Sequence, residues 1–136
     1  MENSFDSGIL KKLRVSDHFR ILIINAPDGY LNVFSSLRPE TEFQLLDKGK
    51  YDFVQVFGSN RMELEREIVK VKEAGKYDAI FWACYPKGGG KMKSDLKRDT
   101  VWAVLELIQL RPVTQIALDE TWSALRGRPH EMVKGY

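Results

Sequence analysis

The stretch "KYDAIFWACYPKGGGKMKSDLKRDTVWAVLELIQLRP", residues 76–112, predicts a strand, a glycine-rich turn and a helix, in that order. Its apolar run at 79–84 is short and uninterrupted, which is typical of a strand buried on both faces. Beyond the turn, apolar side chains recur at helical spacing through residues 101–110, and Trp102 is expected on the buried side of this helix. Strand, turn and helix in succession form the repeating unit of an α/β fold.

The preceding stretch has the same order of elements. "KYDFVQVFGSN" at residues 50–60 opens with the same Lys-Tyr-Asp as "KYDAIFWACYP" at 76–86, which suggests two successive strand-turn-helix units. A strand is expected over 51–57. The helix after it is expected to begin at Asn60 and to end at Gly75, a natural C-cap.

"RILIINA" at residues 20–26 predicts a further buried strand, which ends at the turn 27–29. A helix is expected over 30–37, because its apolar side chains recur at helical spacing. We expect residues 21–26 and 79–83 to be neighbouring or near-neighbouring central parallel strands, because both are apolar on both faces.

Two segments have a less regular pattern. Residues 42–46 are either a strand antiparallel to 51–57 or not a full strand, because the four residues between them are too few for a parallel crossover. "VTQIALDETWSALRGRP" at 113–129 predicts a hairpin or a bent strand pair. Across that hairpin, Asp119 and Arg126 are expected to form a structural ion pair.

The predicted fold class is α/β: one three-layer domain with a mostly parallel sheet, helices on both faces and a C-terminal hairpin or bent strand pair. The domain is expected to span residues 1–136, with an ordered core of about 13–129 and flexible termini.

Composition excludes several classes of protein. The chain has 43% hydrophobic and 29% charged residues, as an ordinary globular protein does, and its net charge of +2 is too small to indicate a polyanionic partner. Its apolar runs are far shorter than the roughly 20 residues that span a bilayer, and no signal peptide is expected at its N-terminus. The single cysteine, Cys84, is expected to be a small buried hydrophobe in a cytoplasmic protein.

The turns that follow the predicted parallel strands would share one edge of the sheet, where ligands bind in open α/β folds. Polar, basic and glycine residues gather in them. The candidate ligand-binding residues are Asn25, Asp28, Ser59, Asn60, Tyr85, Lys87, Gly88, Gly89, Gly90, Lys91, Lys93 and Ser94. The alternative is that turns are polar and glycine-rich for reasons of backbone geometry alone.

Known motifs are largely absent. The residues around Gly90 and Lys91 do not match the Walker pattern, and the turn 25–30 lacks the glycines of a dinucleotide or adenosylmethionine site. His18 and His130 are far apart in the sequence, so no metal site is predicted. No cofactor is predicted either. Ser94 or Asp95 is expected to cap the helix after the basic turn.

Four segments together resemble a bacterial family known only as a domain of unknown function. They are "ILIINAPDGY", "FVQVFGSNRMELE", "IFWACYPKGGGKMKSDLKRD" and "LDETWSALRGRP", and the likeness covers about residues 13–129. The resemblance implies a small cytosolic α/β protein and assigns no reaction and no catalytic residue. The chain departs from the family in its richer glycine stretch after Lys87 and in Gly127, which is expected to loosen the last strand.

The leading functional hypothesis is a domain that binds a small ligand or a phosphate-type anion through the basic loop at residues 85–94. The alternative is a protein-protein interaction module without its own chemistry, and the third is an enzyme of unknown reaction. The expected partners are a small anionic or phosphorylated ligand or another protein, whereas nucleic acid and membrane are not expected.

Overall fold

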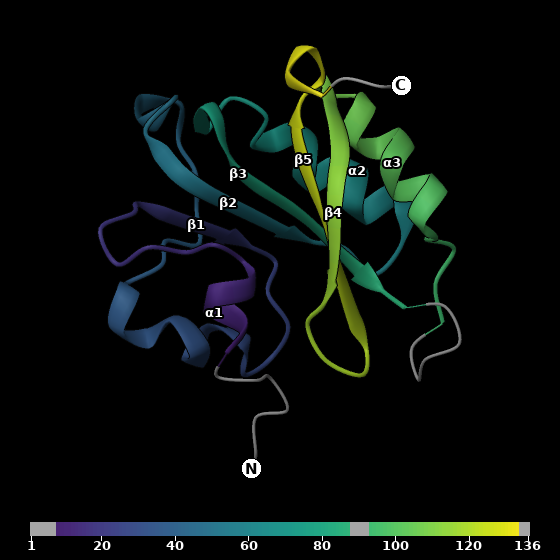
Figure 1. Ribbon diagram of the computed structural model, residues 1–136, viewed down its shortest axis with the longest axis horizontal. Coiled ribbons are helices and arrows are strands. Elements are labelled where there is room, and N and C mark those ends of the chain that lie inside the picture. Colours follow the sequence, from purple (N-terminus) through teal and green to yellow (C-terminus); the bar gives the residue numbers. More distant parts are fainter. Residues whose placement is uncertain (1–7, 88–92, 134–136) are drawn as a thin grey trace.

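A computed structural model describes residues 8–87 and 93–133, and its centre is a five-stranded sheet with the strand order β1-β2-β3-β5-β4 (Figure 1). The strands are β1 (Ile21–Ile24), β2 (Tyr51–Phe57), β3 (Gly75–Pro86), β4 (Leu110–Ala117) and β5 (Trp122–Pro129). The α/β class expected from the sequence is confirmed.

The sheet is mixed. β1, β2 and β3 pair in parallel, whereas β5 is antiparallel to both β3 and β4. The expectation of a mostly parallel sheet is therefore not confirmed, because half of the strand pairings are antiparallel. The hairpin predicted over 113–129 is formed by β4 and β5, and it inserts its second strand beside β3.

β1 lies at the edge of the sheet, so the prediction that it is a central strand was wrong. Its four residues are nevertheless buried, because clusters of apolar side chains cover both of its faces. On its outer side a single parallel bridge joins Leu22 to Glu40, through Ile23 N–H to the Glu40 carbonyl and Glu40 N–H to the Ile21 carbonyl, each 2.8 Å long. β3, the other strand in that prediction, is central.

Helices cover the two faces unequally. The α-helices are α1 (Ile9–Lys12), α2 (Arg61–Lys70) and α3 (Arg98–Glu106), and the 3-10 helices are η1 (Tyr30–Leu37), η2 (Leu45–Asp47) and η3 (His130–Met132). α2 and α3 pack on one face, where their apolar residues join those of the sheet in one cluster. α1 and η1 pack on the other face. Since that face carries only a four-residue α-helix and a 3-10 helix among the described residues, a full third layer is not confirmed.

Helix boundaries differ from the prediction at two places. Asn60 caps α2 as expected, since its Oδ1 accepts from the Glu63 N–H at 2.9 Å. Gly75 is not the C-cap, because α2 ends at Lys70 and Gly75 is the first residue of β3. α3 begins at Arg98, so neither Ser94 nor Asp95 caps it.

The segments 30–37 and 42–46 differ from regular elements. The first is helical as predicted, but it is a 3-10 helix. The second is not a strand: residues 45–47 form η2 and the rest has no regular structure. Of the two alternatives expected for residues 42–46, the one in which they are not a full strand is therefore correct.

Two side chains were predicted to be buried, Cys84 and Trp102. Cys84 is fully buried, and Gln55 Nε2 lies 3.2 Å from its sulfur. Burial raises the pKa of the Cys84 thiol, so this cysteine is the inert core residue that was predicted. Trp102, expected on the buried side of α3, is only half-buried and lies under the Arg98 guanidinium at 5.8 Å.

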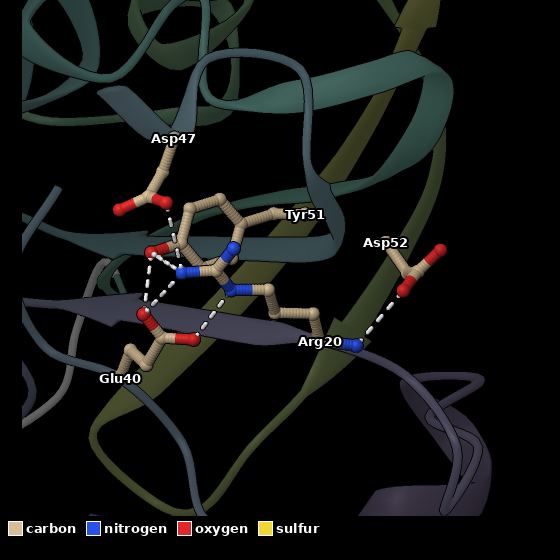
Figure 2. A network of polar contacts seen from close by, with 5 residues as sticks. All are labelled: Arg20, Glu40, Asp47, Tyr51 and Asp52. Carbon is tan, nitrogen blue, oxygen red and sulfur yellow. Dashed lines mark hydrogen bonds and ion pairs between the residues drawn. The ribbon is translucent and has the colours of Figure 1, made fainter. Parts of the chain in front are cut away.

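A network of polar side chains joins the start of β1 to the start of β2 (Figure 2). Arg20 donates to both carboxylate oxygens of Glu40, at 2.7 and 3.0 Å, and its guanidinium lies 4.5 Å from the centre of the Tyr51 ring. Tyr51 Oη donates to Glu40 Oε1 at 2.7 Å, and Asp47 adds an ion pair to Arg20 at 3.3 Å. The hydrogen bonds from Arg20 hold the pKa of Glu40 below its ordinary value. This network anchors the bridge residue Glu40, and it lies at the opposite end of β1 from the turn 25–29.

Within residues 8–87 and 93–133, no helix is long and apolar enough to cross a membrane.

Candidate functional site

The carboxyl ends of β1, β2 and β3 lie at one edge of the sheet, because the three strands are parallel neighbours. The turns that leave these ends contain most of the candidate residues predicted from the sequence. In an open α/β sheet this edge is where ligands bind.

The first turn follows β1. Asn25 and Gly29 both have left-handed backbone conformations, with φ of 62° and 82°. The Asn25 amide donates to the Phe57 carbonyl at 2.9 Å, so it ties the end of β1 to the end of β2. Asp28 is exposed on the same turn. A β-carbon added at Gly29 would meet no atom within 4 Å, so this part of the turn faces open space.

The second turn follows β2, and hydrogen bonds among its own residues and the start of α2 hold it in place. The Ser59 N–H and hydroxyl donate to Glu63 Oε1 at 2.7 and 3.0 Å, while Asn60 accepts from the Glu63 N–H. These bonds form a reciprocal capping arrangement at the start of α2. The Ser59 N–H, with the Ser59 hydroxyl and the Asn25 amide, lowers the pKa of Glu63. Asn25, Ser59 and Asn60 are therefore brought together around Glu63, a residue that was not among those predicted from the sequence.

Gly58 begins this turn and was also missed. A β-carbon at position 58 would lie 2.6 Å from the Cα and Cβ atoms of Leu64. The glycine therefore lets α2 approach β2 closely. A glycine between an apolar strand and a helix is the signal that could have pointed to it.

The third turn follows β3. Tyr85 is buried, and its hydroxyl accepts from Gln115 Nε2 at 3.0 Å. The Lys87 N–H donates to the Thr121 carbonyl at 2.8 Å. Both residues border a shallow hollow of about 400 Å³, which is also lined by Lys97, Arg98, Gln115 and Ser123.

The remaining residues of the basic loop are less well placed. Lys93 is exposed, and the Ser94 hydroxyl accepts from the Leu96 N–H at 3.0 Å. Gly88, Gly89, Gly90 and Lys91 lie outside the described residues. The structure therefore describes the two ends of the loop 85–94, residues 85–87 and 93–94.

Asp119 and Arg126, which were predicted to form an ion pair, lie in different parts of the hairpin. Asp119 lies in the hairpin turn, where its Oδ1 accepts from the N–H groups of Thr121 and Trp122 at 2.8 and 2.7 Å. Arg126 lies further along β5, opposite Trp82. On β4, Arg126 is paired with Thr114, away from the turn that holds Asp119.

A further hollow of about 260 Å³ lies beside the carboxyl end of β1. Ile24, Glu42 and Phe43 line it, together with Glu67 and Lys70 of α2. Glu42 is exposed, so its carboxylate is available to a ligand. Glu42 was not among the residues predicted from the sequence. In dinucleotide-binding folds an acidic residue roughly 20 positions after the first turn binds the ribose, and an acidic residue at about that spacing is the signal that could have found it.

In the part of the chain that the structure describes, no group of three or more His, Cys, Asp or Glu residues could hold a metal ion.

No protein-family model matches the sequence, and no curated protein matches it. Solved structures do match. A SAM-dependent methyltransferase from Aquifex aeolicus is 11% identical and has a TM-score of 0.62, covering 91% of this chain and 89% of its own. The 16S rRNA (adenine(1408)-N(1))-methyltransferase from Catenulisporales acidiphilia is 10% identical, with a TM-score of 0.55 and 95% of both chains covered. A protein of the NADB-Rossmann superfamily from Streptococcus agalactiae is 12% identical, with a TM-score of 0.55, covering 99% of this chain and 73% of its own.

These matches contradict the function expected from the sequence. The expectation was an anion-binding domain or an interaction module, whereas methyltransferases stand among the matching structures over nine-tenths of the chain. The chain has the Rossmann-like fold of the methyltransferase structures that it matches.

Proposed function

We propose that the chain is an adenosylmethionine-dependent methyltransferase. The observation that carries the proposal is the exposed carboxylate of Glu42, in a hollow beside the carboxyl end of β1, in a chain that matches a methyltransferase structure over nine-tenths of both lengths. In this fold class a cofactor lies at that end of the strands.

The side chains present there fit the nucleoside part of the cofactor. A carboxylate accepts hydrogen bonds from ribose hydroxyls, and Glu42 supplies one. The Phe43 ring, which is partly buried beside Glu42, supplies an apolar surface for a base. Gly29, left-handed and facing open space, lets the backbone of the first turn approach a ligand. When bound, the cofactor supplies an electrophilic methyl group.

The first turn differs from the usual glycine-rich form. Pro27 has no N–H to donate, and Gly29 is the one glycine between Asn25 and Tyr30. The proposal therefore assigns recognition to the nucleoside end of the cofactor, through Glu42 and Phe43, more than to the first turn.

Nucleic acid is the substrate class that we propose, although the sequence analysis did not expect it. One matching structure is an rRNA methyltransferase, and another comes from a fibrillarin/Nop5p complex. The hollow at the end of β3 supports this choice, because three of its lining residues, Lys87, Lys97 and Arg98, are cations.

The test is calorimetric titration of the protein with adenosylmethionine and with its demethylated product. Glu42→Gln keeps the shape of the side chain but loses its charge, and a hydrogen bond to a charged group contributes about 1.5–3 kcal/mol. We expect Glu42→Gln to weaken binding by roughly 10-fold or more. Glu120→Gln is the matched control, because Glu120 is an exposed carboxylate in the hairpin turn.

Two results would overturn the proposal. One is that neither compound binds the wild-type protein. The other is that Glu42→Gln and Glu120→Gln bind them equally well.

A further inference from the structure

Arg126 lies in the middle of β5, on the face of the sheet opposite α2 and α3. In the sheet it is paired with Trp82 of β3 on one side and with Thr114 of β4 on the other. Side chains alternate along a strand, and Ala124 belongs to the cluster on the α1 face. Arg126 and Arg128 therefore point to the α1 face as well.

Arg14 approaches the same place from α1. Trp82 Nε1 donates to the Leu13 carbonyl at 3.1 Å, so the end of α1 is held beside the residue that pairs with Arg126. Arg14 follows Leu13 and takes a left-handed backbone conformation, with φ of 66°. Its side chain is exposed. Three arginines, Arg14, Arg126 and Arg128, thus form one cluster, here called the arginine face.

The charge of this cluster is poorly balanced. Asp78 is a counter-charge to Arg126, but both of its oxygens already accept from Arg128, at 2.9 and 2.6 Å. The Nε of Arg126 is buried and has no hydrogen-bond partner within the described residues. Burial, with the nearby charges of Arg14 and Arg128, lowers the pKa of Arg126. A buried donor on a charged group is costly unless an acceptor reaches it.

Arg126 is half-buried, so part of the residue reaches the surface on this face. α3 packs against the other face of β5, where its Leu105 joins Leu125 in one cluster, and α1 and α3 lie on opposite sides of the β4–β5 hairpin (Figure 1). Thr114, the residue paired with Arg126 on β4, is exposed. The α1 face is therefore accessible at Thr114, beside Arg126.

We propose that the arginine face binds the phosphodiester backbone of the nucleic-acid substrate. The inference rests on the proposed function for the identity of the ligand. Guanidinium groups bind phosphate oxygens with two hydrogen bonds at once, which is why arginine predominates where phosphates are recognised. Contacts of this kind position a nucleic acid and do not read its sequence. The net charge of +2 agrees with a local cluster on an otherwise balanced surface.

The experiment measures fluorescence anisotropy of a labelled single-stranded RNA with the full chain, over a range of salt concentrations and without adenosylmethionine. The test variants are Arg126→Gln and Arg14→Gln. Arg66→Gln is the matched control: it loses the same charge, but Arg66 is an exposed residue of α2 on the other face. Arg126→Lys keeps the charge and loses the two-pronged geometry.

We expect Arg126→Gln and Arg14→Gln each to weaken binding about 10-fold at low salt and to lower the slope of log K against log salt by about one. Arg126→Lys should recover part of the affinity, and Arg66→Gln should bind as the wild type does. A melting temperature of Arg126→Gln at or above the wild-type value would show that its weaker binding does not come from misfolding.

The inference is overturned if Arg126→Gln and Arg66→Gln bind RNA equally, or if the wild type does not bind RNA at all. Because the RNA is tested without cofactor, the two proposals fail separately. If the protein does not bind adenosylmethionine, only the methyltransferase proposal is refuted. If RNA binding does not depend on Arg126 and Arg14, only the arginine-face proposal is refuted.

Discussion

Among glycine-to-alanine changes at the glycines that the structure describes, Gly58→Ala should destabilise the fold most. The new β-carbon would lie 2.6 Å from both Cα and Cβ of Leu64 and 2.8 Å from its backbone nitrogen. Ordinary carbon contacts are about 3.5–4.0 Å, so the start of α2 must move by about 1 Å. Leu64 is fully buried, and backbone atoms cannot rotate away from a clash.

Overpacking of a core typically costs about 1–3 kcal/mol, and a clash with backbone atoms belongs at the upper end of that range. For a chain of 136 residues, about 3 kcal/mol lowers the melting temperature by roughly 10 °C. Thermal unfolding followed by circular dichroism measures this directly. Urea unfolding should show a lower midpoint with an unchanged slope.

Gly49→Ala is the control. Gly49 requires a left-handed backbone, with φ of 70°, unlike Gly58, but a β-carbon there meets no atom within 4 Å. Its expected cost is only about 1 kcal/mol, from the backbone conformation alone. If Gly58→Ala melts no lower than Gly49→Ala, then α2 does not approach β2 as closely as described, and the reasoning is refuted.

Three further predictions concern the buried and paired groups. Arg20 holds the pKa of Glu40 below its ordinary value of 4.5, so the stability that this pair contributes is complete above about pH 4.5 and is lost as the pH falls further. Urea unfolding midpoints measured from about pH 7 to 3 should therefore fall less steeply in Glu40→Gln than in the wild type. The Cys84 thiol is fully buried with a raised pKa, so iodoacetamide at about pH 8 should label it only in urea, and rapid labelling of the native protein would contradict this. Tyr30→Phe removes the hydroxyl that donates to Gln55 Oε1 at 2.8 Å and should cost about 1–3 kcal/mol in urea unfolding, part of which the added change Gln55→Leu should restore.

Local signals in the sequence were sufficient for some elements. The strand over 51–57 was predicted with the bounds that it has, because turn residues flank an apolar run on both sides. The β4–β5 hairpin followed from two β-prone runs around an acidic turn.

The position of β1 could not be obtained in this way. A strand that is apolar on both faces indicates that both faces of the sheet are covered there, and β1 is covered on both. It does not report what lies along the edge. There, the bridge to Glu40 and the side-chain network around Arg20 replace a neighbouring strand. Those contacts join residues far apart in the sequence, and no local pattern encodes them.

The same reason explains the errors at helix ends. Ser94 or Asp95 was expected to cap the helix that follows them. Asp95 Oδ1 instead accepts at 2.8 Å from the backbone N–H of Arg61, the first residue of α2. A capping residue can satisfy any helix start that the fold brings near it. The sequence shows which residue is able to cap, but not which helix it reaches.

For the candidate site, the sequence placed the polar turn residues at the carboxyl edge of the parallel strands, where the structure has them, but it did not show which polar groups lack partners. Polar turn residues such as Ser59 and Asn60 were prominent in the sequence, yet they bind Glu63 and the start of α2. Glu42 was not singled out from the sequence, and Arg126 was expected only as the partner of Asp119. The structure shows a hollow beside Glu42 and, among the described residues, a buried Nε without a hydrogen-bond partner on Arg126. Whether a side chain is buried, and whether its polar atoms find hydrogen-bond partners, depends on how the whole chain packs.

The order of the last two strands has a consequence for synthesis on the ribosome. β4 is made before β5, but in the described sheet it is hydrogen-bonded to β5 alone. When β4 leaves the exit tunnel it has no strand to join, and the edge of β3 stays open until residues 122–129 have also emerged. The nascent chain can therefore complete its parallel half early, whereas the antiparallel half is added in one late step. Stalling between the two strands would leave β3 and β4 both exposed to aggregation.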